Sequence, residues 1–261
     1  MKKVRKAVIP AAGFGTRFLP QTKAMPKEML PIVDKPVIQY VVEELVDAGI
    51  TDIILVTGYH KRTIEDHFDA ANLDLIKNLE MGGEKKRPHL EQVKKISALA
   101  NFVYVRQKGP YGNGTPLLNV RHLIGDNEPF IYAFSDDFIK AAPKSQFKQL
   151  IETYNEFKCS ILGSIRAVKD EDYDRYGFAG GKELRDGVID VERIVEKPGK
   201  ASAPSDLANV SGYVFTPDIF EYLDRARLNL DEGAELYYND ALKLMLGDKK
   251  RVIAAEIKGG K

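Results

Sequence analysis

Apolar and polar positions along this chain form blocks that predict strands and helices in turn. Residues 7–9 form a short apolar run, and residues 51–57 form a second run typical of a strand buried on both faces. Between them, residues 36–48 carry apolar side chains at helical spacing, with Pro36 at the start and Gly49 after the end. Strand, helix and strand in this order predict a right-handed crossover and a parallel sheet.

Further apolar runs predict more strands, and helical spacing lies between most of them. These predicted strands cover residues 102–105, 130–134, 160–165 and 213–215. The alternation is typical of a doubly wound α/β fold, so we expect a mostly parallel, Rossmann-like sheet. A chain of 261 residues is long enough for one such domain with a small appended part.

Two regions interrupt the alternation. Residues 73–100 are mostly helical in pattern, charged, and broken at residues 82–88, so we expect an exposed helical hairpin there. Residues 173–198 are rich in glycine and in short β patterns. We expect them to form a small β excursion over one end of the main sheet.

A loop rich in glycine and basic residues follows the first predicted strand. It contains Gly13, Gly15, Arg17, Lys27 and Glu28. Small residues leave backbone N–H groups open to phosphate oxygens, and the two cations add positive charge, so the loop suits a nucleoside triphosphate. It is not a Walker A loop, because Thr16 and Arg17 follow Gly15, and Phe18 stands where a dinucleotide fingerprint needs glycine. The glycines alone would also fit an ordinary basic turn.

Acidic residues suggest a metal site. Asp136 and Asp137 follow the predicted strand 130–134, so we expect them at the carboxyl edge of the sheet, where α/β proteins bind ligands. A carboxylate beside phosphate oxygens suits Mg²⁺, and Asp240 is a second candidate. A strand-end turn and a helix N-terminus would explain the same residues without a metal.

Two further segments carry candidate binding groups. Gln107 and Gly112 lie between a predicted strand and a predicted helix. Glycine there lets a flat base approach the backbone, and the glutamine amide can donate and accept hydrogen bonds. Glu196 and Lys197 place an acceptor beside a cation, as a sugar phosphate requires. The alternatives are an ordinary flexible loop for the first segment and a surface ion pair for the second.

Composition excludes several classes of partner. Lys and Arg total 39 against 38 Asp and Glu, and the resulting net charge of +1 provides no global field for nucleic acid or an anionic membrane. Cys159 is the only cysteine, which excludes an intrachain disulfide and fits a reducing compartment. The apolar run near the N-terminus is too short for a signal peptide or a bilayer span. We therefore expect a soluble, cytoplasmic protein that binds small molecules.

These segments together resemble the bacterial UTP–glucose-1-phosphate uridylyltransferases of the sugar nucleotidyltransferase superfamily. The resemblance rests on residues 11–36, Gln107, Gly112, Gly114, Asp136, Tyr176, Gly177, 195–198 and 233–240. It implies a GT-A-like fold and a Mg²⁺-dependent reaction of UTP with α-D-glucose 1-phosphate that gives UDP-glucose and pyrophosphate. It also implies a homo-oligomer, either a dimer or a tetramer. Family members usually continue past the position of Lys261 into a further loop and terminal helices.

The resemblance assigns roles by position. It implies that uridine and its phosphates contact Ala12, Gly13, Gly15, Glu28, Gln107 and Gly112. Arg17 and Lys27 would hold the triphosphate and the leaving pyrophosphate, and Asp136 and Asp240 would bind Mg²⁺. Gly177, Glu196 and Lys197 would hold the glucose phosphate. The nucleotide part would cover about residues 1–140 of a single domain, and the sugar part about residues 141–261.

Three segments depart from the family pattern. Residues 115–117 are Thr-Pro-Leu instead of His-Ala-Val, and residues 211–213 are Ser-Gly-Tyr instead of Gly-Arg-Tyr. Residues 235–240 are Glu-Leu-Tyr-Tyr-Asn-Asp instead of Glu-Ile-Gln-Leu-Thr-Asp. The competing hypotheses are the same chemistry with dTTP, or with GTP and mannose 1-phosphate, a catalytically silent sugar-nucleotide sensor, and a dinucleotide oxidoreductase. The missing third glycine disfavours the last of these.

Overall fold

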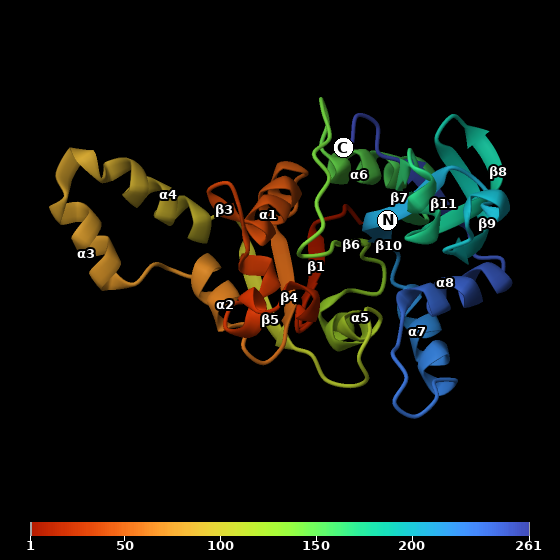
Figure 1. Ribbon diagram of the computed structural model, residues 1–261, viewed down its shortest axis with the longest axis horizontal. Helices are drawn as coiled ribbons and strands as arrows, with labels where there is room; N and C mark the ends of the chain where they lie inside the picture. The colour runs from red at the N-terminus through yellow and green to blue at the C-terminus, as the bar shows by residue number, and fades with distance from the viewer. Residues whose placement is uncertain (1, 261) are drawn as a thin grey trace.

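One mixed sheet of nine strands forms the centre of the protein, which the computed structural model describes over residues 2–260 (Figure 1). The strands follow one another across the sheet in the order β5-β4-β1-β6-β10-β7-β11-β9-β8. Their bounds are β1 Lys6–Ala11, β4 Asp52–Thr57, β5 Asn101–Arg106, β6 Phe130–Tyr132, β7 Ser160–Arg166, β8 Gly177–Arg185, β9 Val188–Glu196, β10 Leu207–Phe215 and β11 Val252–Glu256. A separate two-stranded sheet pairs β2 (Pro31–Ile32) with β3 (Lys35–Pro36).

The first four strands across the sheet form a parallel unit. β1 pairs in parallel with β4 and β6, and β4 pairs in parallel with β5. Helix α1 (Val37–Asp47) makes the crossover from β1 to β4, and Gly49 after it has a φ of 90°, which favours glycine. The strands and the helix predicted here are confirmed, although β6 ends at Tyr132, before the predicted end at residue 134.

Helices cover both faces of the sheet, as a doubly wound fold requires (Figure 1). Side chains of α1, α2 (Arg62–Phe68) and α6 (Gln146–Phe157) pack into one buried cluster with one face of the strands. Side chains of α5 (Thr115–Val120), α7 (Ile219–Leu228) and α8 (Tyr238–Gly247) pack into the other. No helix within residues 2–260 combines the length and the apolar character needed to cross a bilayer.

The sheet is mixed, because β10 runs antiparallel to β6, β7 and β8, and β9 runs antiparallel to β11 and β8. β10 extends well beyond the predicted segment 213–215. Its pairing with β7 shifts register between Asn209 and Tyr213. The residues before this bulge also pair with β8, and those after it pair with β6. Bulges of this kind bend a strand and redirect its side chains, often beside a binding site.

The glycine-rich region predicted as a β excursion forms the hairpin β8–β9, which is hydrogen-bonded to the main sheet. β9 pairs with β11, and β8 pairs with the first part of β10. Strands β10, β7, β11, β9 and β8 therefore close into a ring. The hairpin is an extension of the sheet that curls over it, and its open end, at Gly177 and Glu196, faces the site described below.

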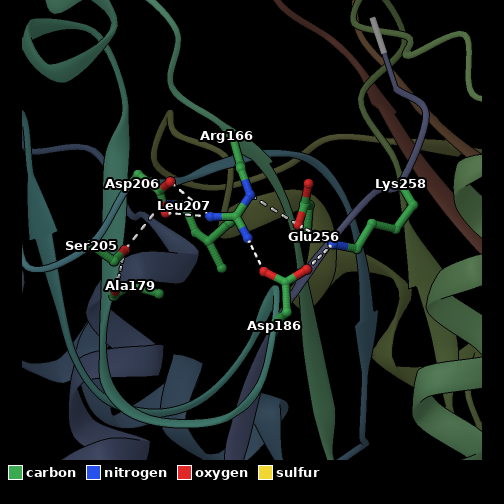
Figure 2. Close-up of polar contacts among 8 residues, drawn as sticks. All are labelled: Arg166, Ala179, Asp186, Ser205, Asp206, Leu207, Glu256 and Lys258. Atoms are coloured by element: carbon green, nitrogen blue, oxygen red, sulfur yellow. Dashed lines mark hydrogen bonds and ion pairs between the residues drawn. The ribbon is translucent and has the colours of Figure 1, made fainter.

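A cluster of charges ties together the ends of several strands of this ring (Figure 2). The Arg166 guanidinium contacts Asp186, reaches Asp206 Oδ2 at 2.8 Å and lies 3.2 Å from Glu256 Oε2. Lys258 Nζ bridges Asp186 and Glu256 at 2.8 and 2.7 Å. The end of β7, the turn between β8 and β9, the segment before β10 and the end of β11 are thereby held at one place.

The helical hairpin predicted from residues 73–100 is confirmed. Helices α3 (Leu73–Met81) and α4 (Arg87–Ser97) project away from the sheet (Figure 1). Each has a single buried residue, Leu79 in α3 and Leu90 in α4. The hairpin is therefore an exposed arm and contributes little to the core.

Candidate active site

The glycine-rich loop begins where β1 ends, at the carboxyl edge of the parallel strands. It continues through three short 3-10 helices, Thr16–Phe18, Gln21–Lys23 and Lys27–Met29. Gly15 has a φ of 66°, and its carbonyl accepts hydrogen bonds from Phe18 N (2.9 Å) and Thr22 Oγ1 (2.7 Å). A β carbon on Gly13 would meet nothing closer than 3.9 Å, so its backbone is open to a ligand. Ala12 precedes it, half-buried, against Gly58.

The two cations of this loop differ in their surroundings. Arg17 is exposed and forms no hydrogen bond or ion pair with any other of residues 2–260. Lys27 is largely covered, and its Nζ lies 2.8 Å from Asp136 Oδ2. Asp136 follows β6, as predicted, so the end of that strand lies beside the loop. Arg17 is free to meet an incoming anion, whereas Lys27 is held by a carboxylate.

Glu28 lies in an unexpected position for a residue assigned to uridine, because its side chain is fully buried. Its Oε2 accepts a hydrogen bond from Lys61 Nζ at 2.7 Å, and Oε1 has no hydrogen-bond partner within the described residues. Burial raises the pKa of the Glu28 carboxyl, and the Lys61 ammonium opposes part of this rise. The pair joins the end of the glycine-rich loop to the segment after β4.

Gln107 and Gly112 lie on the loop after β5, which packs against the segment before α8. Gly114 N donates to Leu236 O, and Leu236 N donates to Tyr111 O, each at 2.8 Å. Gly112 has a φ of 109°, and a β carbon on it would lie 2.2 Å from Leu236 O. The close approach of the Leu236 backbone thus requires glycine at position 112, whether or not a ligand also approaches this position.

The residues expected to hold the sugar lie together in one pocket. Its volume is about 590 Å³, and it lies between the open end of the β8–β9 hairpin, the bulge of β10 and the start of α8. Gly177, Glu196, Lys197 and Asp240 all line it, with Asn113, Asp137, Tyr176, Asn209, Tyr213, Tyr238 and Asn239 among their neighbours. The structure therefore brings together four positions that were predicted from three separate segments.

Lys197 has an unusual backbone conformation in this pocket. Its φ is 46°, in the left-handed region that a lysine rarely adopts, and its N–H donates to Tyr176 O at 3.0 Å. Strain of this kind is concentrated at binding sites. Glu196 and Lys197 are both exposed and form no ion pair with each other in the described part of the chain. The surface ion pair that the sequence left open is therefore absent here.

The two predicted metal ligands have different surroundings. Asp240 lines the sugar pocket, whereas Asp136 pairs with Lys27, and it is the neighbouring Asp137 that lines the pocket. Asp240 Oδ1 also lies 3.4 Å from Lys243 Nζ. Within residues 2–260 no group of three or more His, Cys, Asp or Glu side chains is placed so that it could hold a metal ion.

Three residues of the site were missed by the sequence analysis. Lys61 pairs with Glu28, Asn113 lines the sugar pocket from the loop after β5, and Asn239 contacts Glu196. Two signals were available in the sequence: Asn113 lies between two glycines, and Asn239 lies beside Asp240. Nothing in the local sequence around Lys61 marks it.

The chain is similar to known proteins over nearly its whole length. The profile of the family described as nucleotidyl transferase matches residues 6–260. A UTP–glucose-1-phosphate uridylyltransferase of Bacillus subtilis strain 168 is 49% identical over 259 residues, which is 99% of this chain and 86% of the relative. A protein of the same name from Staphylococcus epidermidis RP62A is 46% identical over 265 residues, covering all of this chain and 88% of the relative.

Solved structures show the same similarity. A UDP-glucose pyrophosphorylase in complex with UDP-glucose matches with a TM-score of 0.84 and 40% identity, covering 99% of this chain and 92% of the other. A UTP-bound UGPase from Acinetobacter baumannii matches with a TM-score of 0.88 and 35% identity, covering 99% and 87%. This chain belongs to the nucleotidyl transferase family and, within it, to the bacterial UTP–glucose-1-phosphate uridylyltransferases.

Proposed function

We propose that this protein transfers the uridylyl group of UTP to α-D-glucose 1-phosphate, giving UDP-glucose and pyrophosphate. The observation that carries the proposal is that the loop after β5, which is assigned to uridine, also lines the sugar pocket. Asn113 belongs to the loop that contains Gly112, and it also lines the pocket that contains Glu196 and Lys197. A nucleotide on the loop and a sugar phosphate in the pocket would therefore be neighbours. The full-length similarity to uridylyltransferases supports the same substrates.

The nucleotide is assigned to the part of the chain from about residue 1 to about residue 140. Its ligands in the proposal are Ala12, Gly13, Gly15, Glu28, Gln107 and Gly112. The open backbone at Gly13 and the bend at Gly15 support a role in phosphate binding, because bare N–H groups suit phosphate oxygens. Glu28, being buried, would act mainly by fixing the loop through Lys61.

The sugar phosphate is assigned to the part from about residue 141 to about residue 261. Glu196 would accept hydrogen bonds from sugar hydroxyls, and Lys197 would contact the phosphate. Glycine at position 177 would leave room for the Glu196 carboxylate, because a β carbon there would lie 2.7 Å from Oε1.

The residues present fit Mg²⁺. Asp136, beside Lys27, and Asp240, in the sugar pocket, offer carboxylate oxygens, which this ion prefers, and Mg²⁺ takes only one or two protein carboxylates and completes its shell with phosphate and water oxygens. In the proposal Asp136 and Asp240 hold Mg²⁺. When bound, the ion would neutralise negative charge on the phosphates.

The protein needs to align the two substrates and to stabilise the negative charge on their phosphates. It does not need a general base. The second pKa of a phosphate ester is about 6, so the attacking oxygen is already largely ionised near neutral pH. That oxygen forms a bond to the α-phosphorus of UTP, and the bond to the bridging oxygen breaks, so pyrophosphate leaves with the electron pair. Holding the two groups in line can lower the barrier by about 7–11 kcal/mol. Arg17, Lys27 and Lys197 would stabilise charge on the transferred and leaving groups.

One assay tests the proposal. The purified protein is incubated with UTP, glucose 1-phosphate and Mg²⁺, and pyrophosphate release is followed, with reactions lacking the sugar phosphate as blanks. We expect turnover that depends on all three components. A panel that replaces UTP by dTTP or GTP, and glucose 1-phosphate by mannose 1-phosphate, tests specificity, and a preference for any of these would overturn the assignment. Binding of UDP-glucose without any turnover would indicate a sensor. Gel filtration tests the homo-oligomer, a dimer or a tetramer, that the family resemblance implies.

A further inference from the structure

Asn239 contacts Glu196, the acidic residue to which the sugar hydroxyls are assigned. The Asn239 amide Nδ2 donates a hydrogen bond to Glu196 Oε1 at 2.5 Å, between residues 43 positions apart in the chain. Both side chains line the pocket of about 590 Å³. Helix α8, which carries Asn239, packs beside β9, which ends at Glu196 (Figure 1). The contact is thus part of the wall of the sugar pocket.

Gly177 lies beside the same carboxylate on the other strand of the hairpin. Gly177 and Glu196 are register partners, and a β carbon at position 177 would lie 2.7 Å from Oε1, so a larger residue there would displace the carboxylate. Glycine at position 177 therefore leaves room for Oε1 where it accepts the hydrogen bond from Asn239. Oε2 forms no hydrogen bond or ion pair with any other described residue. One carboxylate oxygen is engaged by the protein, and the other remains available as an acceptor.

Asn239 stands on a fixed support. It is the second residue of α8, and the N–H of Tyr238 before it donates to Asn113 Oδ1 at 3.0 Å. The Tyr238 side chain is buried, and its hydroxyl lies 2.8 Å from the Tyr213 hydroxyl. These contacts fix the first turn of α8, so the amide of Asn239 is presented by a rigid element.

A fixed acceptor matters because Glu196 is exposed and has a long side chain. An untethered glutamate loses rotational freedom when it binds a ligand, and this loss weakens binding, whereas a pre-oriented carboxylate avoids most of it. We propose that Asn239 is a positioning residue that orients the Glu196 carboxylate toward the sugar hydroxyls and thereby sets selectivity for the sugar phosphate. This inference rests on the function proposed above.

Steady-state kinetics of Asn239→Ala, Glu196→Ala and the double variant test the inference. Asn229→Ala is the matched control, because within residues 2–260 the Asn229 amide hydrogen-bonds only to the Arg225 carbonyl, in α7. We expect Asn239→Ala to raise the KM for glucose 1-phosphate about tenfold, with the KM for UTP and the Mg²⁺ dependence unchanged. The preference for glucose 1-phosphate over galactose 1-phosphate should narrow. In the Glu196→Ala background, Asn239→Ala should cause no further loss, because it acts through Glu196.

Several results would overturn the inference. One is a wild-type KM for glucose 1-phosphate in Asn239→Ala. Another is that Asn239→Ala raises this KM by the same factor in the Glu196→Ala background as in the wild type. Asn239→Leu keeps the shape without the donor and should behave like Asn239→Ala, so wild-type selectivity in that variant would also contradict the role of the hydrogen bond. Unfolding midpoints equal to that of Asn229→Ala establish that the variants fold.

The failure of the proposed function would look different. The wild type would then release no pyrophosphate from UTP and glucose 1-phosphate. Calorimetric titration of glucose 1-phosphate into the same set of variants would in that case decide the inference. A lower affinity for glucose 1-phosphate in Asn239→Ala than in the wild type, with no further decrease in the Glu196→Ala background, would support the inference. Equal affinities for the wild type and Asn239→Ala would overturn the inference.

Discussion

Lys27 Nζ lies 2.8 Å from Asp136 Oδ2, although the two residues are 109 positions apart in the chain. The contact joins the basic loop after β1 to the segment after β6, so the cation assigned to the triphosphate and the carboxylate assigned to the metal are neighbours. One side chain of each charge thus stands at the carboxyl edge of the parallel strands, where α/β proteins bind ligands. This pair is therefore the centre of the proposed phosphate site.

The first prediction concerns the choice between adjacent aspartates. Asp136→Asn removes the charge beside Lys27 and should lower Mg²⁺-dependent turnover roughly 100-fold or more, because a metal ligand is lost. Asp126→Asn, an exposed aspartate on a loop elsewhere, should have no effect. The measurement is turnover as a function of Mg²⁺ concentration. If Asp137→Asn abolished activity and Asp136→Asn did not, the metal would belong to Asp137, which lines the sugar pocket.

Arg17→Ala should mainly lower kcat. Arg17 is exposed and has no protein partner within residues 2–260, so its removal should not disturb the fold, and its charge would act on the leaving pyrophosphate. The loss of one such group costs roughly 100- to 1000-fold in turnover. Arg87→Ala, on the projecting helix α4, is the control. Unchanged kcat in Arg17→Ala would remove this residue from the site.

Lys197→Ala should raise the KM for glucose 1-phosphate. A charged hydrogen bond to phosphate is lost, and we expect a rise of about tenfold or more, with little change in the KM for UTP. Lys182→Ala removes an exposed lysine from β8 and provides the comparison. Initial rates at varied sugar phosphate measure the effect. An equal rise in both KM values would contradict a role confined to the sugar phosphate.

The buried pair of Glu28 and Lys61 should contribute to stability. Lys61→Met leaves the Glu28 carboxylate buried without its cation, and the free energy of unfolding should fall by about 3–5 kcal/mol. Adding Glu28→Gln to Lys61→Met should recover part of this loss, because the uncompensated charge is removed. Denaturant unfolding measures both, with exposed Lys77→Met as the control. A change below about 1 kcal/mol in Lys61→Met would be inconsistent with a buried ion pair.

Glu44 should make stability depend on pH. Burial raises its pKa from 4.5 to about 7, with Gln146 N–H donating to Oε1 and Oε2 lacking a partner within the described residues. Between about pH 4.5 and 7 the folded protein keeps a proton that the unfolded chain has lost, so stability should fall as pH rises through this window, by up to about 3 kcal/mol. Glu44→Gln should flatten that part of the profile, and exposed Glu91→Gln should not. Unfolding at pH 5 and pH 8 measures the slope, and a slope that persists in Glu44→Gln would exclude this residue as its source.

The elements near the N-terminus follow from local pattern. The apolar runs at residues 7–9 and 51–57 and the helical spacing between them correspond to β1, β4 and α1, because the spacing of apolar residues indicates which face of an element can be buried. The loop after β1 was also recognisable, since its glycines and cations are contiguous. The exposed arm of α3 and α4 was predicted from charge and helical period.

Long-range pairing determined the rest. No local signal states that β10 runs antiparallel between β6 and β7, that its bulge adjoins the sugar pocket, or that the β8–β9 hairpin joins the sheet. The contacts of Lys61 with Glu28 and of Asn239 with Glu196 likewise join residues that are distant in sequence.

Residue types and their spacing thus suffice for the helices, for most strands and for the chemistry that the chain carries, because each depends on neighbours within a few positions. The shape of the site and the partner of each charge depend on which strands pair and on which side chains are buried together. Those contacts join segments that are distant in the sequence and have no local pattern that predicts their pairing. They can therefore be identified only from the tertiary structure.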